Sequence, residues 1–227
     1  MFKGTSASAG IGIGKAVIVE EAELVITRNE VADAEAEIQR FKGALEKTIA
    51  ATQKMADDLA SRVGEKEAEI MQGHMMLLSD PMLTGEIENS VKNDKVNCEF
   101  AIENVCNMYA DMFASMGDEL MQQRATDMRD IKVRMQRTLM GLESVDVSLL
   151  PKGSILVAKD LTPSMTAGIN PENVSGIVTE LGGKTSHSAI LARALEIPAV
   201  VAVNGLMDAV KDGDSVVLDC IHQAIYC

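Results

Sequence analysis

Residues 180–201 read ELGGKTSHSAILARALEIPAVV, the most informative stretch of the sequence. A short apolar run precedes two glycines, and His187 comes directly before an apolar repeat of helical period. Pro198 and the apolar run 199–203 then predict the end of the helix and the next strand. A helix start offers unpaired backbone N–H groups and the positive end of its dipole, so this order favours an anion. His187 can carry such an anion covalently, as a phosphoramidate.

Other sites built from similar residues do not fit the spacing. A nucleotide-binding P-loop requires glycine at position 178, which is Val178 here. The G-x-S-x-G turn of serine hydrolases is absent. A metal site needs several ligands, and the other histidines, His74 and His222, lie far away in the sequence without matching spacing. Because a lone histidine at a helix start is more often a cap or a surface residue, the rest of the chain has to support the phosphate interpretation.

The sequence on both sides of this stretch predicts an α/β domain. Thr162 followed by Pro163 is typical of a helix N-cap and first helical position. Residues 1–28 read as β structure with glycine-rich bends, and Leu24–Ile26 extend it. We therefore expect residues 1–28 and 144–227 to form one α/β domain. The other expected strands are 154–158, 174–179, 199–203, 216–219 and 223–227.

Residues 29–143 have a helical period instead, and we predict an inserted all-α helical bundle. The expected helices are about 29–63, 66–78, 81–93, 98–116 and 126–140. The segment holds 12 of the 15 methionines. Methionines at this spacing, such as Met108, Met112 and Met116, are most often core filling, although flexible thioethers also suit a surface that repacks against a partner.

Composition narrows the class of protein. The formal net charge is −13, and residues 29–143 carry 22 acidic and 13 basic side chains, which gives −9. This balance argues against nucleic acid as a partner and suits a basic protein. No apolar run is long enough for a membrane span, and the four cysteines show no C-x-x-C pairing. A cytoplasmic protein with reduced thiols, bound to no membrane, is therefore expected.

The quoted stretch resembles the active-site signature of phosphohistidine domains in the phosphoenolpyruvate-using phosphotransferases. That signature combines Gly-Gly-x-Thr-Ser-His with a helix containing Ala-Arg and then Pro-Ala-Val. The resemblance implies the swivelling phosphohistidine fold and phosphorylation of His187 at Nε2. It also implies that the Thr166 hydroxyl fixes the imidazole tautomer and that Thr185 contacts the phosphoryl group. No metal and no cofactor are expected in this half of the transfer.

The helical insertion indicates one branch of these enzymes. Residues 73–78, 124–131 and 160–164 are similar to enzyme I of the bacterial sugar phosphotransferase system. In that family the insertion binds the small phosphocarrier protein HPr. Together with the quoted stretch, these similarities extend the resemblance over essentially the whole chain. It implies that this chain is a phosphoenolpyruvate-protein phosphotransferase, acting in phosphoryl transfer from phosphoenolpyruvate to HPr. The partner-facing residues implied are Glu65, Glu67, His74, Arg124 and Arg129.

Complete enzyme I also has a C-terminal barrel that binds phosphoenolpyruvate and Mg²⁺. We expect this chain to be an isolated N-terminal domain, a monomer that exchanges phosphate with HPr and that needs the barrel, as its second partner, for phosphoenolpyruvate. Two alternatives stay open. One is the phosphohistidine domain of a nitrogen-related or fused paralogue, and the other is a non-catalytic helical interaction module.

Overall fold

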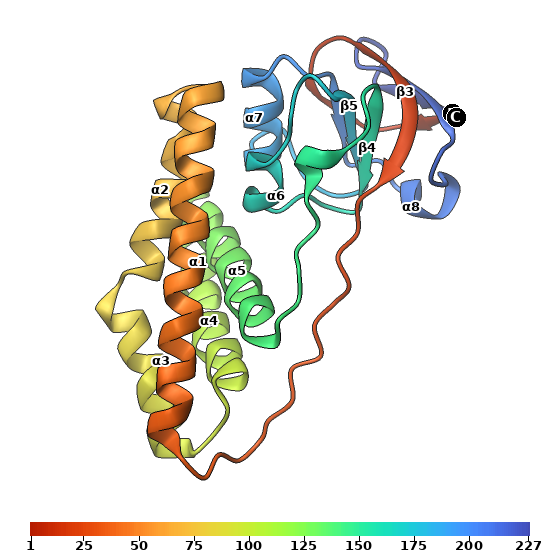
Figure 1. Cartoon of the computed structure of the whole chain (residues 1–227). Helices are drawn as coiled ribbons and strands as arrows, with labels where there is room; N and C mark the ends of the chain where they lie inside the picture. The colour runs from red at the N-terminus through yellow and green to blue at the C-terminus, as the bar shows by residue number, and fades with distance from the viewer. The chain divides into compact units, whose positions relative to one another are not determined.

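The computed structural model describes residues 1–227, which divide into two compact units (Figure 1). The first unit comprises Met1–Glu21 and Val145–Cys227, and the second comprises Ala22–Ser144. The first unit is α/β and the second is all-α. The predicted fold class, an α/β phosphohistidine-type domain with an inserted helical subdomain, is confirmed in its architecture.

The first boundary between the units lies at Glu21 rather than at residue 28. The segment that follows is held by side chains of the helical unit. The Arg137 guanidinium donates to the backbone oxygen of Ala22 at 2.6 Å, and the Asn97 side chain accepts from the backbone N–H of Asn29 at 2.9 Å. The expectation that residues 24–26 extend the β region is wrong, because they form no strand and belong to the helical unit.

The α/β unit is built on one eight-stranded sheet with the order β1-β8-β7-β3-β4-β5-β6-β2. Strands β3, β4, β5 and β6 are parallel to one another, whereas β7, β8, β1 and β2 pair antiparallel with their neighbours. The strands are β1 (Phe2–Lys3), β2 (Thr5–Ser8), β3 (Ile11–Ile18), β4 (Ser154–Ala158), β5 (Val174–Thr179), β6 (Ala199–Val201), β7 (Ser215–Asp219) and β8 (Ala224–Tyr226). The hairpin expected at the C-terminal end is confirmed by β7 and β8.

Apolar side chains cover both faces of this sheet, which is why β4 is buried along its whole length. Successive strand side chains point to opposite faces, so Leu156 belongs to one apolar cluster and Ile155 to the other. The first cluster contains Ala189 of α7 (His187–Ala194) and is joined by Met165 of α6 (Pro163–Ala167). The second contains Leu206 of α8 (Leu206–Ala209). A short 3₁₀ helix, η1 (Val147–Leu149), precedes β4.

The all-α unit packs its helices around one apolar core. Its helices are α1 (Ala34–Arg62), α2 (Glu65–Leu78), α3 (Pro81–Asp94), α4 (Cys98–Ser115) and α5 (Glu119–Met140). Asp80 and Pro81 begin α3 as their sequence indicates, with the Asp80 side chain accepting from the Met82 N–H. Helix α5 begins at Glu119, earlier than the expected residue 126, because the Asp118 side chain caps it by accepting from the Met121 N–H.

The methionines at the C-terminal half of α4 are exposed, which corrects the expectation that they fill the core. Met108, Met112 and Met116 have exposed fractions of 55%, 45% and 53%. The buried residues of α4 end at Ala110, so the core covers one side of the helix and leaves this row uncovered. We call the exposed large apolar residues of helices α2 to α5 and of the α4 C-cap the methionine surface: Met76, Met82, Met108, Met112, Met116, Leu120 and Met140.

Candidate active site

The loop between β5 and α7, residues 180–186, contains Gly182 and Gly183 and is called the glycine loop here. It lies at the carboxyl end of the parallel strands, the edge at which α/β sheets commonly bind ligands. Strand β5 ends at Thr179, whose hydroxyl donates to the Leu181 backbone oxygen at 2.6 Å. The Leu181 N–H donates to the backbone oxygen of Lys159, directly after β4, at 2.8 Å. Gly182 then adopts a φ of 101°, which residues other than glycine rarely adopt. These bonds fix the start of the loop to the ends of two strands.

Helix α7 begins at His187, and Ser186 caps it. The Ser186 hydroxyl donates to the Gly183 backbone oxygen at 2.8 Å and accepts from the Ala189 N–H at 3.3 Å. The cap therefore closes the loop onto the first turn of the helix. His187 occupies the first helical position, where the helix dipole is positive and an added phosphoryl group would be stabilised. The helix predicted from residue 188 onward thus starts one residue earlier.

Arg193 fastens the loop from inside α7. Its Nη1 donates to the backbone oxygen of Lys184 at 3.0 Å and to that of Ala7, in β2, at 2.9 Å. One guanidinium therefore ties the loop before His187 to an edge strand of the sheet. The sequence contains this arginine in its Ala-Arg pair, but the pair alone does not reveal which carbonyl groups it holds. Arg193 is a positioning residue for the loop.

We expect Arg193→Ala to slow phosphate acceptance by His187 on the order of tenfold to a hundredfold, because the loop loses its tie and the reacting atoms are misplaced. The rate of His187 phosphorylation is measured at a saturating concentration of phosphorylated HPr. The free energy of unfolding is measured separately in urea. Lys184→Ala is the matched control, since it removes an exposed side chain and keeps the carbonyl group that Arg193 binds. Equal rates for Arg193→Ala and Lys184→Ala would contradict this role.

Asp160 lies beside the glycine loop. Its Oδ1 accepts from the Leu161 N–H at 2.8 Å and lies 3.9 Å from the position that a Cβ would take at Gly182. Burial raises the pKa of the Asp160 carboxyl group. Asp160 belongs to the stretch 160–164 that resembles enzyme I, and the sequence of that stretch does not indicate a role for it.

The two threonines expected at the site occupy different environments. Thr166 is buried on α6, which packs against α7, and its hydroxyl donates to the Thr162 backbone oxygen at 2.9 Å. Its oxygen keeps acceptor capacity for an imidazole N–H. Thr185 is exposed in the loop, two residues before His187. Their roles at the imidazole and at the phosphoryl group remain predictions.

The residues expected to face a partner all lie in the all-α unit. Glu65 and Arg129 are exposed, and Glu67 and Arg124 are partly exposed. His74 is the exception, because its side chain is fully buried.

This burial contradicts a partner-facing position for His74. Its Nε2 lies 3.0 Å from Oδ1 of Asp127, so the histidine joins α2 to α5 in the interior. Because Asp127 lies 53 positions away, the sequence gives no sign of the pair.

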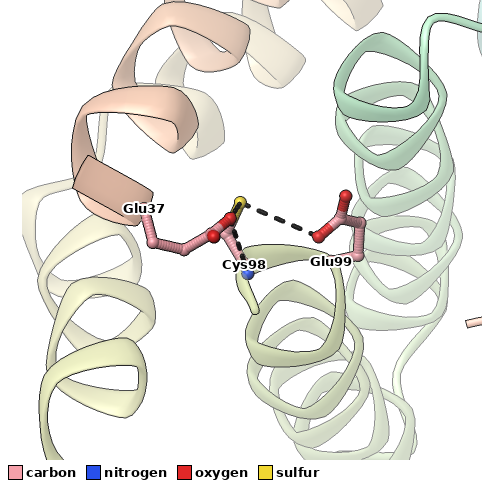
Figure 2. A group of neighbouring side chains, drawn as sticks. All are labelled: Glu37, Cys98 and Glu99. Carbon is pink, nitrogen blue, oxygen red and sulfur yellow. Dashed lines mark hydrogen bonds between the residues drawn. The ribbon is translucent and has the colours of Figure 1, made fainter. Parts of the chain in front are cut away.

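One cluster has the composition of a metal site, and Figure 2 shows it: Glu37, Cys98 and Glu99 offer ligand atoms within 4.8 Å of one another. Arg40 already pairs with both carboxylates, through Glu37 Oε1 at 2.6 Å and through Glu99. Burial, followed by the hydrogen bond to Glu37, raises the pKa of the Cys98 thiol, which donates to that carboxylate at 3.0 Å. A protonated thiol and occupied carboxylates suit a guanidinium, so the cluster joins the N-terminal ends of α1 and α4.

We expect Arg40→Met to lower the free energy of unfolding by about 1–2 kcal/mol near neutral pH, a value reduced for its partial exposure. Burial alone would raise the pKa of Glu99, but the Arg40 hydrogen bond brings it below the ordinary value of 4.5. A carboxyl group whose pKa is lowered by folding stabilises the fold at a pH above its ordinary pKa. This stabilisation is lost as the pH falls through the pKa of the folded state. The difference between wild type and variant, measured by urea unfolding, should therefore narrow below pH 4.5. A difference independent of pH would contradict this assignment.

No helix combines the length and the apolar composition that a bilayer-spanning segment requires.

Comparison with known families gives two matches. A family model described as PEP-utilising enzyme, N-terminal, matches residues 3–124, and one described as PEP-utilising enzyme, mobile domain, matches residues 150–223. The second range contains the glycine loop and His187.

Individual relatives agree with these matches. The chain is 40% identical over 221 residues to the phosphoenolpyruvate-protein phosphotransferase of Bacillus subtilis (strain 168), which covers 97% of the chain and 39% of that relative. It is 42% identical over 218 residues to the protein of the same name from Listeria monocytogenes, covering 96% of the chain and 38% of the relative. The chain thus spans well under half the length of the curated relatives that it matches.

Two solved structures share the fold. A solution NMR structure of Enzyme I is 38% identical and superposes with a TM-score of 0.86, covering 100% of this chain and 92% of the other. The N-terminal domain of Enzyme 1 - Nitrogen is 24% identical with a TM-score of 0.65, a likeness in fold alone.

Proposed function

We infer the function from one premise, that the chain belongs to the phosphoenolpyruvate-utilising enzymes, whose N-terminal model covers more than half of it. The family expected from the Gly-Gly-x-Thr-Ser-His loop is thereby confirmed. We propose that His187 carries a phosphoryl group as an intermediate between phosphoenolpyruvate and the phosphocarrier protein HPr, as a phosphoenolpyruvate-protein phosphotransferase of a sugar phosphotransferase system. The observation that carries the proposal is the position of His187, which follows the glycine loop as the first residue of α7.

The chain's own residues suit this chemistry. A neutral imidazole is a nucleophile near neutral pH, and in our proposal its Nε2 attacks the phosphorus atom held on a histidine of HPr. One N–P bond forms, the N–P bond in HPr breaks, and the leaving imidazole takes the electron pair. The reverse step regenerates phosphorylated HPr. The Thr166 hydroxyl oxygen accepts a hydrogen bond from Nδ1–H of the imidazole and so fixes its tautomer. Thr185 and the backbone N–H groups in the first turn of α7 stabilise the negative charge of the phosphoryl group.

The all-α unit supplies the docking surface for HPr in this proposal. Residues 29–143 carry a net charge of −9, which speeds encounter with a basic partner. The methionine surface adds flexible apolar side chains that can adapt to such a partner. Glu65, Glu67, Arg124 and Arg129 provide charged contacts around it.

We expect Met112→Asp to weaken HPr binding by on the order of tenfold or more, because apolar anchors carry much of the affinity of an interface. Calorimetric titration of the chain with HPr measures this change. Val25→Asp is the matched control: Val25 is 82% exposed in the same unit but lies outside the methionine surface. Equal binding by wild type and Met112→Asp would exclude this surface.

The remaining functions are assigned to the part of the relatives that this chain does not span. We propose that phosphoenolpyruvate and Mg²⁺ bind there, that no cofactor is needed in the residues described here, and that the transfer takes place in the cytoplasm. The isolated chain is proposed to be a monomer.

Neither alternative is favoured. Identity to the nitrogen-related structure is 24%, against 38% for the Enzyme I structure. A non-catalytic helical module would have no need for the intact loop before His187. The direct test is transfer of labelled phosphate from phosphorylated HPr to the chain, followed by its return to fresh HPr. Absence of transfer in either direction would reject the proposed function.

A further inference from the structure

Gly73 occupies an unusual place in the interior of α2. Glycine inside a helix is less favourable than alanine by about 0.5–1 kcal/mol, so its presence there calls for a local reason. Gly73 is buried, and a Cβ built on it would lie 2.8 Å from Nη1 and 3.8 Å from Cζ of Arg124. No other heavy atom outside the local helix backbone lies within 4 Å of that position. The guanidinium of Arg124 therefore rests on α2 in the space that the missing side chain leaves.

The neighbouring residue fixes the two helices at this point. His74 is fully buried, and its Nε2 lies 3.0 Å from Oδ1 of Asp127, three positions after Arg124 on α5. Helix α5 is thus joined to α2 beside the point where the Arg124 side chain crosses. A second helical glycine, Gly43 in α1, has no heavy atom within 4 Å of its Cβ position. Close contact with an arginine is therefore a property of Gly73 and does not follow from being a helical glycine.

We propose that Gly73 is a positioning residue, whose lack of a side chain holds the Arg124 guanidinium on α2 and directs it toward an anionic group of the docking partner. The inference rests on the proposed function, because it assigns Arg124 to the HPr-binding surface. The first turn of α2 is acidic, with Glu65 and Glu67, so a fixed guanidinium adds a local positive site to a negative surface. A guanidinium that is already placed loses less conformational entropy on binding an oxyanion than a freely moving one.

The test compares four variants of the whole chain: Gly73→Ala, Arg124→Ala, the double variant, and Gly43→Ala as the matched glycine control. A methyl group at Gly73 displaces only the flexible end of Arg124, so the urea unfolding midpoint should not fall below that of wild type. Gly73→Ala should nevertheless weaken HPr binding by roughly threefold to tenfold. In the Arg124→Ala background the same substitution should change the dissociation constant by less than about twofold. Gly43→Ala should bind HPr like wild type.

A second measurement follows the side chain directly. Nitrogen relaxation at Nε of Arg124 should report an ordered guanidinium in wild type and in Gly43→Ala, and a mobile one in Gly73→Ala. Unchanged HPr binding by Gly73→Ala would overturn the proposal, as would a loss of binding that persists without Arg124. Wild-type chain that binds no HPr would reject the proposed function, and the relaxation of Arg124 would still decide whether Gly73 holds it.

Discussion

Replacement of His187 by alanine is expected to abolish phosphate acceptance while leaving the fold intact. In our proposal the imidazole at the start of α7 is the nucleophile, and the loop before it is held by backbone bonds and by Arg193. Phosphorylated HPr should therefore transfer no label to His187→Ala. The urea unfolding midpoint and the far-ultraviolet circular dichroism should match those of wild type.

His74→Ala provides the matched histidine control. Because His74 is buried and paired with Asp127, its removal should lower the free energy of unfolding by about 3 kcal/mol or more, and the folded fraction should still accept phosphate. Phosphate retained by a folded His187→Ala variant would exclude His187 as the acceptor.

The second large effect concerns the phosphate donor. Labelled phosphoenolpyruvate with Mg²⁺ is expected to leave the chain essentially unlabelled over a period in which phosphorylated HPr labels it completely. Positioning accounts for most of the catalysis of phosphoryl transfer, and the trianionic donor needs cations that hold it against the nucleophile. Arg193 is engaged with two backbone carbonyl groups, and the cluster of possible metal ligands at Glu37 lies in the all-α unit and is paired with Arg40.

The same incubation with catalytic amounts of HPr and a full-length relative is the positive control, because phosphorylated HPr then forms in the tube and should label the chain. Rapid labelling by phosphoenolpyruvate and Mg²⁺ alone would place the donor site within these 227 residues and contradict the division of roles proposed here.

Much of the fold can be predicted from the sequence because local signals agree with the tertiary structure. Asp80 with Pro81, and Thr162 with Pro163, mark helix starts through caps that depend on neighbouring residues only. The strands of the sheet centre are continuous apolar runs, such as 154–158, because both faces of the sheet are covered. The glycine loop is likewise local, which is why His187 stands out.

The features that could not be predicted depend on distant partners. Nothing near His74 in the sequence indicates that it will be buried and paired with Asp127. Likewise, Arg193 donates a hydrogen bond to the backbone oxygen of Ala7, which lies 186 positions away. The methionines of α4 share one helical period with its core residues, and periodicity does not say how far along a helix the core extends. The start of α5 at Glu119 lies outside the predicted helix because residues 122–124 are polar, and the Asp118 cap marks this start.

Phosphorylation of His187 can be observed directly by nuclear magnetic resonance of the chain labelled with nitrogen-15 in its histidines, recorded after exchange with phosphorylated HPr. We expect one phosphoryl group per chain, phosphorus coupling to Nε2 of His187, and unchanged signals from His74 and His222. The group should disappear when unphosphorylated HPr is added in excess. A phosphoryl group on Nδ1 of His187 or on another residue, or the absence of any phosphoryl group, would contradict the proposed mechanism.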